Sequence, residues 1–341
     1  MNNEPFFIIG TERSGTNLLR LILNSHPDIC IPHPPHIMKN FFGLEPLYGD
    51  LSRDEAFRKL IRDVALMVGL HPYPWDIRVD EEQVFRNARG RDLISIFFAV
   101  YGQYLNYSEK KRWGCKSTFM IYHAALIRYY YPKAQFIYMV RDGRDVAASA
   151  KKTIFNHYSA YYCAQLWKKE QQIGIHLLGK LPAESVFLLK YEQLLAGPEE
   201  TLKSLCAFLG HDYRPEMLDF FSTQEARKSG SLSAAWKNTS KPLLRLNSGK
   251  FQKDLTKKEI DLFEAVAFRE LDYFSYTLSR PLHTLEGAAL RETGFKAGYF
   301  WEEKMSMLRV QFAHLFTDRN IGLRFRKFWF LRLLKLLRKL L

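Results

Sequence analysis

The sequence predicts an α/β fold in which a central, mostly parallel sheet is flanked by helices. Three short apolar runs, at Phe6–Gly10, Ala134–Val140 and Ser185–Tyr191, are typical of strands that are buried on both faces. Each run is followed by a segment with helical features, and strands that alternate with helices indicate a parallel sheet. The length of 341 residues fits one large α/β domain with extensions, or two domains.

The elements follow one another in strand–loop–helix units. After the first strand, apolar residues at helical spacing from Leu18 predict a helix that ends before Pro27. The segment Ala124–Pro132 predicts a helix before the second strand, and a further helix starts near Val146. After the third strand and a loop, proline at 198 and glycine at 210 mark the start and the end of another helix.

The positive charge is concentrated in two segments. The net charge is +14, and Arg227–Lys258 contains nine basic residues against one acidic residue, a net +8. Arg319–Leu341 contains eight basic residues and no acidic one, a further +8, so the rest of the chain is close to neutral. A phosphate-rich ligand or an anionic surface would account for either segment, and a solvated face remains the alternative for each.

These segments also shape the predicted domain organisation. Ser229–Lys258 is rich in Ser, Asn and Lys and lacks periodicity, so we interpret it as a long loop. Beyond Arg280 the pattern becomes helical, aromatic and basic. We therefore predict an α/β domain at residues 1–280 and a helical C-terminal extension at residues 281–341.

The composition excludes several classes of protein. Hydrophobic residues make up 47% and charged residues 25%, which excludes wholesale disorder. No run of 18 apolar residues occurs, so no standard membrane span is expected. The N-terminus lacks a basic segment followed by a long apolar one, so we expect no signal peptide and a cytoplasmic location. Four scattered cysteines predict buried reduced thiols rather than a zinc site: Cys30, Cys115, Cys163 and Cys206.

The loop Gly10–Asn17 is a candidate phosphate cradle. It lies between a predicted strand and a predicted helix, where backbone N–H groups and the helix N-terminus converge on one point. The glycine spacing matches a Walker loop, but Thr16 stands where that motif needs lysine, and Arg13 is the nearby cation. A tight turn without a ligand is the alternative.

Two segments carry a family resemblance. RSGTNLLRLILNSHPDI, which begins at Arg13, resembles the 5′-phosphosulfate loop of sulfotransferases that use 3′-phosphoadenosine 5′-phosphosulfate (PAPS). FIYMVRDGRDVAASAKK is similar to their 3′-phosphate segment, in which an arginine ends the strand and a serine follows eight residues on, here Arg141 and Ser149. The resemblance extends over roughly Pro5 to Leu271 and implies a P-loop-like sulfotransferase fold, with PAPS as donor, PAP as product and no metal.

The resemblance also implies which residues bind the donor. For the 5′-phosphosulfate end they are Arg13, Ser14, Gly15, Thr16 and Asn17, and for the 3′-phosphate end Arg141, Ser149 and Lys250. A guanidinium at a strand's carboxyl end suits a phosphate, because open α/β sheets bind ligands there. An ion pair with Asp142 or Asp145 is the alternative for Arg141, and for Arg144 we favour a helix-capping salt bridge.

Catalysis would need cations and a general base. Charge builds on the leaving phosphate during such a transfer, and Arg13 and Lys116 are candidates to stabilise it. Lys116 lies in WGCKST, similar to a Gly-x-Lys-Ser/Thr-Pro element of the family, and a surface lysine is its alternative. Tyrosylprotein sulfotransferases place a catalytic glutamate near the position of His33. Because no carboxylate stands there, we expect His33, or else His36, to act as the base.

The sequence thus predicts a sulfotransferase that moves a sulfuryl group from PAPS to a hydroxyl, or less readily an amine, of a glycan, lipid or small metabolite. The alternatives are a P-loop ATP-dependent kinase and a membrane-associated nucleotide-binding protein without transferase activity. Residues 319–341 form a basic amphipathic helix with Trp and Phe, which suits an anionic membrane surface and a peripheral location on its inner face. Packing on the domain or at a homodimer interface is the alternative for this helix, and nucleic acid is not an expected partner.

Overall fold

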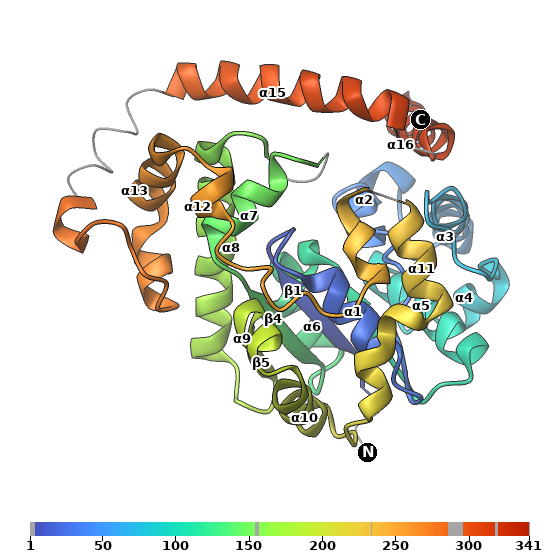
Figure 1. Ribbon diagram of the computed structural model, residues 1–341. Helices are drawn as coiled ribbons and strands as arrows, with labels where there is room; N and C mark the ends of the chain where they lie inside the picture. The colour runs from blue at the N-terminus through green and yellow to red at the C-terminus, as the bar shows by residue number, and fades with distance from the viewer. Residues whose placement is uncertain (1–3, 154–156, 233, 286–295, 318–319, 341) are drawn as a thin grey trace.

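The computed structural model describes residues 4–153, 157–232, 234–285, 296–317 and 320–340. Five parallel strands form one sheet in the order β2-β3-β1-β4-β5 (Figure 1). The strands are β1 (Phe6–Gly10), β2 (Ile29–Cys30), β3 (Arg112–Lys116), β4 (Gln135–Val140) and β5 (Val186–Lys190). The predicted α/β class with a parallel central sheet is therefore confirmed.

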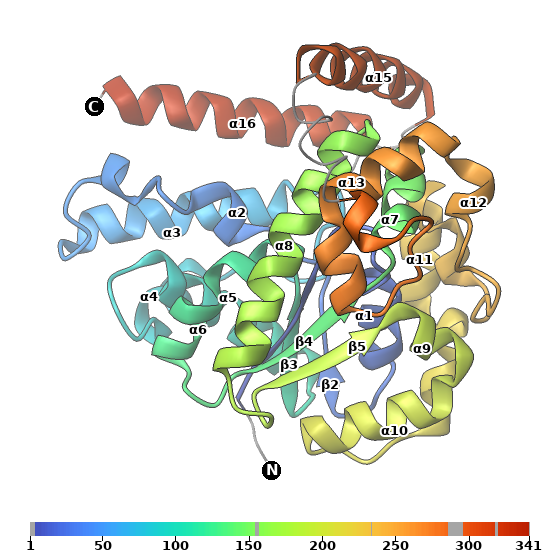
Figure 2. The same cartoon turned by 90° about the vertical axis from the view of Figure 1, so that its left-hand side faces the viewer.

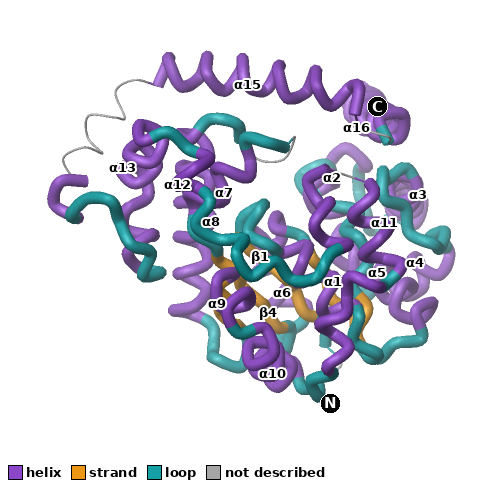
Figure 3. The backbone as a smooth tube through the Cα atoms, viewed as in Figure 1, coloured by secondary structure: helices purple, strands orange, loops and turns teal. Residues whose placement is uncertain are grey.

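The sheet has a hydrophobic core on each face, because successive side chains of a strand point to opposite faces. In β1, Phe7 belongs to the larger core and Phe6 and Ile8 to the smaller one. Helices that cover the first face include α3 (Asp54–Gly69), α5 (Leu93–Ser108), α6 (Ala124–Tyr130) and α8 (Ala160–Lys180). Helices α1 (Thr16–Asn24), α9 (Tyr191–Ala196) and α10 (Pro198–Leu209) cover the other face (Figure 2). Figure 3 shows the strands enclosed between these layers.

Most of the predicted elements are confirmed. The three predicted strands are β1, β4 and β5, and the predicted helices are α1, α6, α7 (Gly143–Ala150) and α10. Helix α10 has Pro198 in its first turn and ends at Gly210, which adopts the left-handed conformation with φ 75°. The four cysteines are buried and unpaired.

The long loop predicted at Ser229–Lys258 is wrong in part. The segment contains the end of α11 (Gln224–Leu232), the 3-10 helix η4 (Ala234–Ser240), α12 (Phe251–Asp254) and the start of α13 (Lys257–Tyr273). Helix α11 is polar and has a weak sequence signal, and a tertiary hydrogen bond from Asn17 Nδ2 to Ser229 Oγ, at 3.2 Å, helps to hold it. Helix α13, in contrast, starts with a capping box formed by Thr256 and Glu259. The loop predicted after β5 is likewise helical, since α9 starts there.

The C-terminal extension is helical, as predicted, with α15 (Lys296–Thr317) and α16 (Ile321–Leu340). Both helices lie at the end of the molecule opposite the N-terminus (Figures 1 and 2). Helix α16 contacts α3, and its Leu334 is buried. Residues 286–295 of the extension lie outside the described residues, and the domain boundary at residue 280 stays a prediction. Within the described ranges, no helix combines the length and the apolar content that a membrane crossing requires.

A buried ion network joins α7 to α13. Arg144 Nη1 donates to Glu264 Oε1 at 2.5 Å, and Arg144 Nη2 donates to Asp142 Oδ2 at 2.7 Å. Asp142 also caps α7 by accepting from the Arg144 N–H, so the predicted helix-capping salt bridge is confirmed. Because Glu264 is fully buried, its charge depends on this arginine.

We predict that Arg144→Met lowers the free energy of unfolding by about 3–5 kcal/mol, because it leaves two buried carboxylates without their cation. Urea denaturation followed by circular dichroism measures the effect. The same substitution at Lys59, which forms an exposed ion pair with Glu55, serves as the control and is expected to have a far smaller effect. Equal losses in the two variants would contradict the proposed importance of the network.

Candidate functional site

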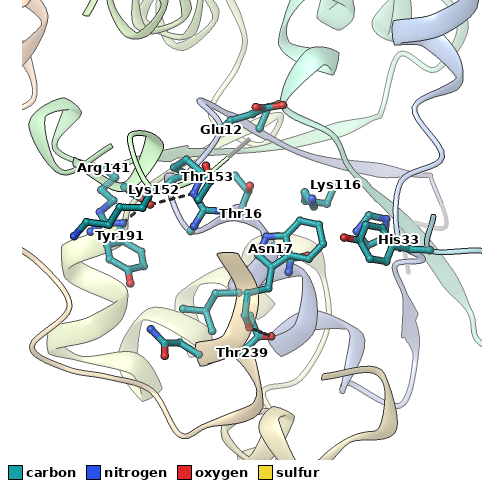
Figure 4. Close-up of a pocket in the computed structure, with 18 of the residues that line it drawn as sticks. Glu12, Thr16, Asn17, His33, Lys116, Arg141, Lys152, Thr153, Tyr191 and Thr239 are labelled. Atoms are coloured by element: carbon teal, nitrogen blue, oxygen red, sulfur yellow. Dashed lines mark hydrogen bonds between the residues drawn. The ribbon is translucent and has the colours of Figure 1, made fainter. Parts of the chain in front are cut away.

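A cavity of about 920 Å³ opens at the carboxyl edge of the sheet. Parallel strands all end at this edge, so the residues after each strand become neighbours. In strand order they are His33 after β2, Lys116 at the end of β3, Arg13 after β1, Arg141 after β4 and Tyr191 after β5. Figure 4 shows the same progression, from Tyr191 and Arg141 on one side to His33 on the other.

The structure brings the predicted site residues together. Those that line this one cavity are Arg13, Gly15, Thr16, Asn17, His33, His36, Lys116, Arg141, Ser149 and Lys250. Ser14 lies buried behind the lining, and its Oγ has no hydrogen-bond partner among the described residues. The Asn17 side chain is already engaged, because it accepts from Arg20 and donates to Ser229. The individual chemical roles of these residues stay predictions.

The loop after β1 has the geometry of an anion cradle. Gly15 is the N-cap of α1, with φ 94°, and no side chain caps the helix. A Cβ at Gly15 would lie 2.5 Å from the Tyr191 ring, so a larger residue does not fit. The first N–H groups of α1 have no partner within the helix, and they favour a bound anion.

Two arginines meet beside this cradle. Arg13 Nε donates to Ser149 Oγ at 3.1 Å, and Arg141 Nη1 donates to the Arg13 carbonyl at 3.3 Å. Burial, followed by the charge of Arg141, lowers the pKa of Arg13 to about 10. Arg141 also pairs with Asp145 at 3.2 Å, so the ion pair considered as the alternative is present. Arg141 Nε is nevertheless buried without a hydrogen-bond partner in the described part of the chain.

The segment before α12 is anchored to the same cluster. Asp145 accepts from the N–H groups of Gly249 and Phe251, at 2.8 and 2.9 Å. Arg141 donates to the Asn247 carbonyl at 3.0 Å. Lys250, which lies between the two anchored residues and is exposed, lines the cavity.

Lys116 occupies the middle of the site and is not the surface lysine considered as its alternative. It is buried, and it forms no ion pair with any residue the structure describes. Burial, followed by the charge of Arg20, lowers its pKa to about 7. A buried ammonium group is costly, and an anionic ligand would add to the partial compensation that the charge of Glu12 provides.

Three histidines form the far end of the cavity. The His71 ring centroid lies 5.3 Å from that of His33 and 5.9 Å from that of His36, and the His33 ring also packs on Tyr73 at 4.4 Å. Burial, together with the charge of His71, lowers the pKa values of His33 and His36 well below 6.5. Neither ring nitrogen of His33 has a hydrogen-bond partner among the described residues. His33 is therefore a neutral imidazole with a free acceptor nitrogen, and its lowered pKa makes it a weaker base than an exposed histidine.

Several lining residues were not found from the sequence. His71 follows α3, and Trp236 belongs to η4, in segments without a recognisable motif. Glu12 lines the cavity and lies 3.8 Å from Lys39. Lys327 of α16 also lines it, although the sequence predicted for that helix only binding to a membrane surface or packing on the domain or at a homodimer interface. Of these four residues, only Glu12 could have been found from the sequence, because it is a carboxylate inside the glycine loop.

A possible metal-ligand group lies elsewhere. Among the described residues, only His26, Asp28 and His211 place three ligand atoms within 4.8 Å of one another. Both ring nitrogens of His26 already contact backbone groups, because Nδ1 accepts from the Asp28 N–H and Nε2 lies 2.9 Å from the Asp212 carbonyl. These contacts leave His26 poorly suited to a metal.

A family profile and several known proteins are similar to this chain. The Sulfotransferase family profile matches residues 5–215. The chain is 24% identical over 265 residues to protein-tyrosine sulfotransferase 1 from Danio rerio. The aligned region covers 75% of this chain and 67% of that protein. It is 23% identical to protein-tyrosine sulfotransferase 2 from Gallus gallus, and it spans only about half (52%) of that protein.

A solved structure shares the fold. It is the sulfotransferase domain of the olefin synthase from Synechococcus PCC 7002, with a TM-score of 0.54 and 19% sequence identity. The similarity covers 81% of this chain and 96% of that domain. The P-loop-like sulfotransferase fold predicted from the sequence is therefore confirmed.

The buried histidines make stability depend on pH. Burial, followed by the charge of Lys327, lowers the pKa of His71 from 6.5 to about 3. Below pH 6.5 the unfolded chain binds a proton at this residue that the folded protein does not, so stability falls as the pH falls. Between pH 7 and pH 5 His71 is expected to lower the free energy of unfolding of the wild type by about 2 kcal/mol. We predict that His71→Asn does not show this part of the loss.

Asparagine can still accept from the Tyr73 N–H, as His71 Nδ1 does, so the local fold is retained. Urea denaturation at a series of pH values measures the slope. His176→Asn, at an exposed position of α8, is the matched control and should leave the slope unchanged. Indistinguishable slopes for His71→Asn and the wild type would contradict the assignment.

Proposed function

The chain belongs to the sulfotransferase family, and on that premise we propose that it transfers a sulfuryl group from PAPS to a hydroxyl acceptor. The observation that carries the proposal is the order of groups along one cavity. Two arginines and an uncapped helix N-terminus lie at one end, neutral histidines lie at the other, and the buried Lys116 lies between them.

The residues present suit a nucleotide with phosphate groups at both ends. Arg141 lines the cavity, and its Nε has no hydrogen-bond partner in the described residues, so its guanidinium can bind a phosphate oxygen. The glycine at position 15 lets a ligand approach the backbone closely. PAPS, when bound, supplies the activated sulfuryl group. The lysine of a Walker loop is absent, and no observation favours the ATP-dependent kinase.

The chain's own groups account for the transfer step. Arg13 and the first N–H groups of α1 hold the 5′ end, and Arg141 with Ser149 holds the 3′-phosphate. His33 takes the hydroxyl proton on a ring nitrogen while the acceptor oxygen forms its bond to sulfur. The bond between sulfur and the 5′-phosphate oxygen breaks, and its electron pair stays on that oxygen. Lys116 and Arg13 stabilise the charge that develops there.

His33 is favoured over His36 by its surroundings. The charge of Lys116 contributes to the lowered pKa of both histidines. Both ring nitrogens of His33, but only Nδ1 of His36, are buried without a hydrogen-bond partner among the described residues, so His33 offers a free acceptor nitrogen in either tautomer. The relatives are named for protein tyrosine, whose phenolic hydroxyl is an oxygen acceptor, and this supports a hydroxyl rather than an amine acceptor.

We predict that Arg13→Ala and Arg141→Ala each weaken the binding of PAP by about 1.5–3 kcal/mol, because each removes charge-assisted hydrogen bonds. Isothermal titration calorimetry measures the effect. Arg62→Ala, at an exposed position of α3, is the control and should bind PAP as the wild type does. Unchanged affinity in both site variants, or tighter binding of Mg–ATP than of PAP, would overturn the proposal.

We predict that His33→Gln lowers the turnover number by about 10²–10⁴-fold, because it removes the general base, while the affinity for PAP is retained. A labelled-PAPS transfer assay and calorimetry measure the two quantities. His36→Gln is the matched control and should reduce turnover far less. A larger loss in His36→Gln, or in Glu12→Gln, would assign the base to that residue instead.

A further inference from the structure

The two C-terminal helices each expose an apolar stripe. On α15 the stripe consists of Trp301, Met305 and Leu308, spaced four and three residues apart. On α16 it consists of Phe325, Trp329, Leu333 and Leu336, spaced four, four and three residues apart. These spacings place each set on one helix face, and every one of these side chains is half exposed or more.

The opposite face of α15 packs on the protein. Tyr299 stacks on Tyr161 with ring centroids 4.7 Å apart. Glu303 accepts from the N–H groups of Tyr158 and Ser159 at 2.9 and 2.7 Å. The α15 stripe therefore points away from the domain.

Helix α16 is arranged in the same way. Its buried Leu334 belongs to the larger core, and Arg324 Nη2 donates to the Tyr73 hydroxyl at 3.2 Å. Leu334 lies on the helix face opposite the stripe, because it follows Phe325 by two and a half turns. In both views the two helices form one layer at the same end of the molecule (Figures 1 and 2). Exposed apolar stripes on a shared layer indicate a binding surface.

The charges identify the partner. Arg326, Arg332 and Lys335 are exposed on α16, and residues 319–341 contain no acidic side chain. Aromatic and aliphatic side chains flanked by arginine and lysine suit the boundary between acyl chains and anionic headgroups. A second copy that packed through α16 would bring the like charges of that helix together, so the charge pattern of α16 favours an anionic bilayer.

The inner side of α16 connects this surface to the active site. Phe328 and Leu331 line the cavity, together with Arg324 and Lys327. The Phe328 ring lies 5.7 Å from the ring of Trp329 in the exposed stripe. Apolar side chains thus run from the outer surface to the cavity, whose wall here also carries two cations.

We propose that α15 and α16 dock on an anionic bilayer and that the acceptor is an amphiphile of that bilayer, whose hydroxyl-bearing headgroup enters the cavity beside α16. The docking follows from the helices alone, whereas the identity of the acceptor rests on the proposed function. Headgroups that carry an anionic group are favoured, because Lys327 and Arg324 face them.

Vesicle flotation of the full chain tests the docking. The wild type is expected to float with vesicles of phosphatidylglycerol and phosphatidylcholine and to float weakly with phosphatidylcholine alone. The fraction bound to vesicles should be at least about tenfold lower for the double variant Trp301→Ser/Trp329→Ser than for the wild type. The matched control is Tyr107→Ser/Tyr129→Ser, which removes two exposed aromatic residues from α5 and α6 and should float as the wild type does. Equal flotation of the two double variants, or no flotation of the wild type, would overturn the docking.

Two further measurements separate the other outcomes. Sedimentation tests whether the surface joins two copies instead. If the wild type is a dimer that does not bind vesicles, and the Trp301→Ser/Trp329→Ser variant is a monomer, the proposal is wrong.

A labelling experiment tests the acceptor. Labelled PAPS is supplied with vesicles of total membrane lipid, and label is expected in the organic extract. Label confined to water-soluble acceptors would overturn the amphiphilic acceptor alone. Absence of PAP binding in calorimetry would instead overturn the proposed function and leave the flotation result standing.

Discussion

All five strands of the sheet run parallel, so each delivers the residues that follow it to the same edge. The arrangement of the site depends on this constraint. Because β1 lies between β3 and β4, the glycine loop lies between Lys116 and Arg141. The outer strands add His33 and Tyr191 at the two ends. The order of the strands is therefore the order of chemical groups along the cavity.

Burial gives these groups their chemical character. The same low-polarity surroundings lower the pKa values of Arg13 and Lys116, which are cations, and keep His33 as a neutral imidazole. An anion brought between the cations would offset their cost of burial. In the proposed mechanism the cations stabilise the charge on the leaving oxygen, and the neutral imidazole at the far end of the cavity accepts the proton.

The C-terminal helices link this chemistry to the outside of the molecule. Helix α16 contributes Lys327 and Phe328 to the cavity from one side and exposes Trp329 on the other. A helix that serves only as a cover would bury its single apolar face. The presence of apolar residues on both faces is the physical reason for the proposal that α16 both docks on a bilayer and lines the cavity that the acceptor enters.

The chain's sequence was sufficient for the parallel α/β class and for the convergence of Arg13 with Arg141, because each follows an apolar strand and such strands end at a common edge. It did not reveal β2, which has two residues, or β3, which begins with Arg112 and ends with Lys116 and therefore lacks a continuous apolar run. His71 and Lys327 reach the cavity from distant segments, and local patterns carry no information about such contacts. Helix α11 is also held by side-chain hydrogen bonds from Asn17 and Arg20 of α1, which its own sequence does not reveal. Local periodicity thus specifies elements, whereas long-range packing decides which side chains share a cavity and which become buried there.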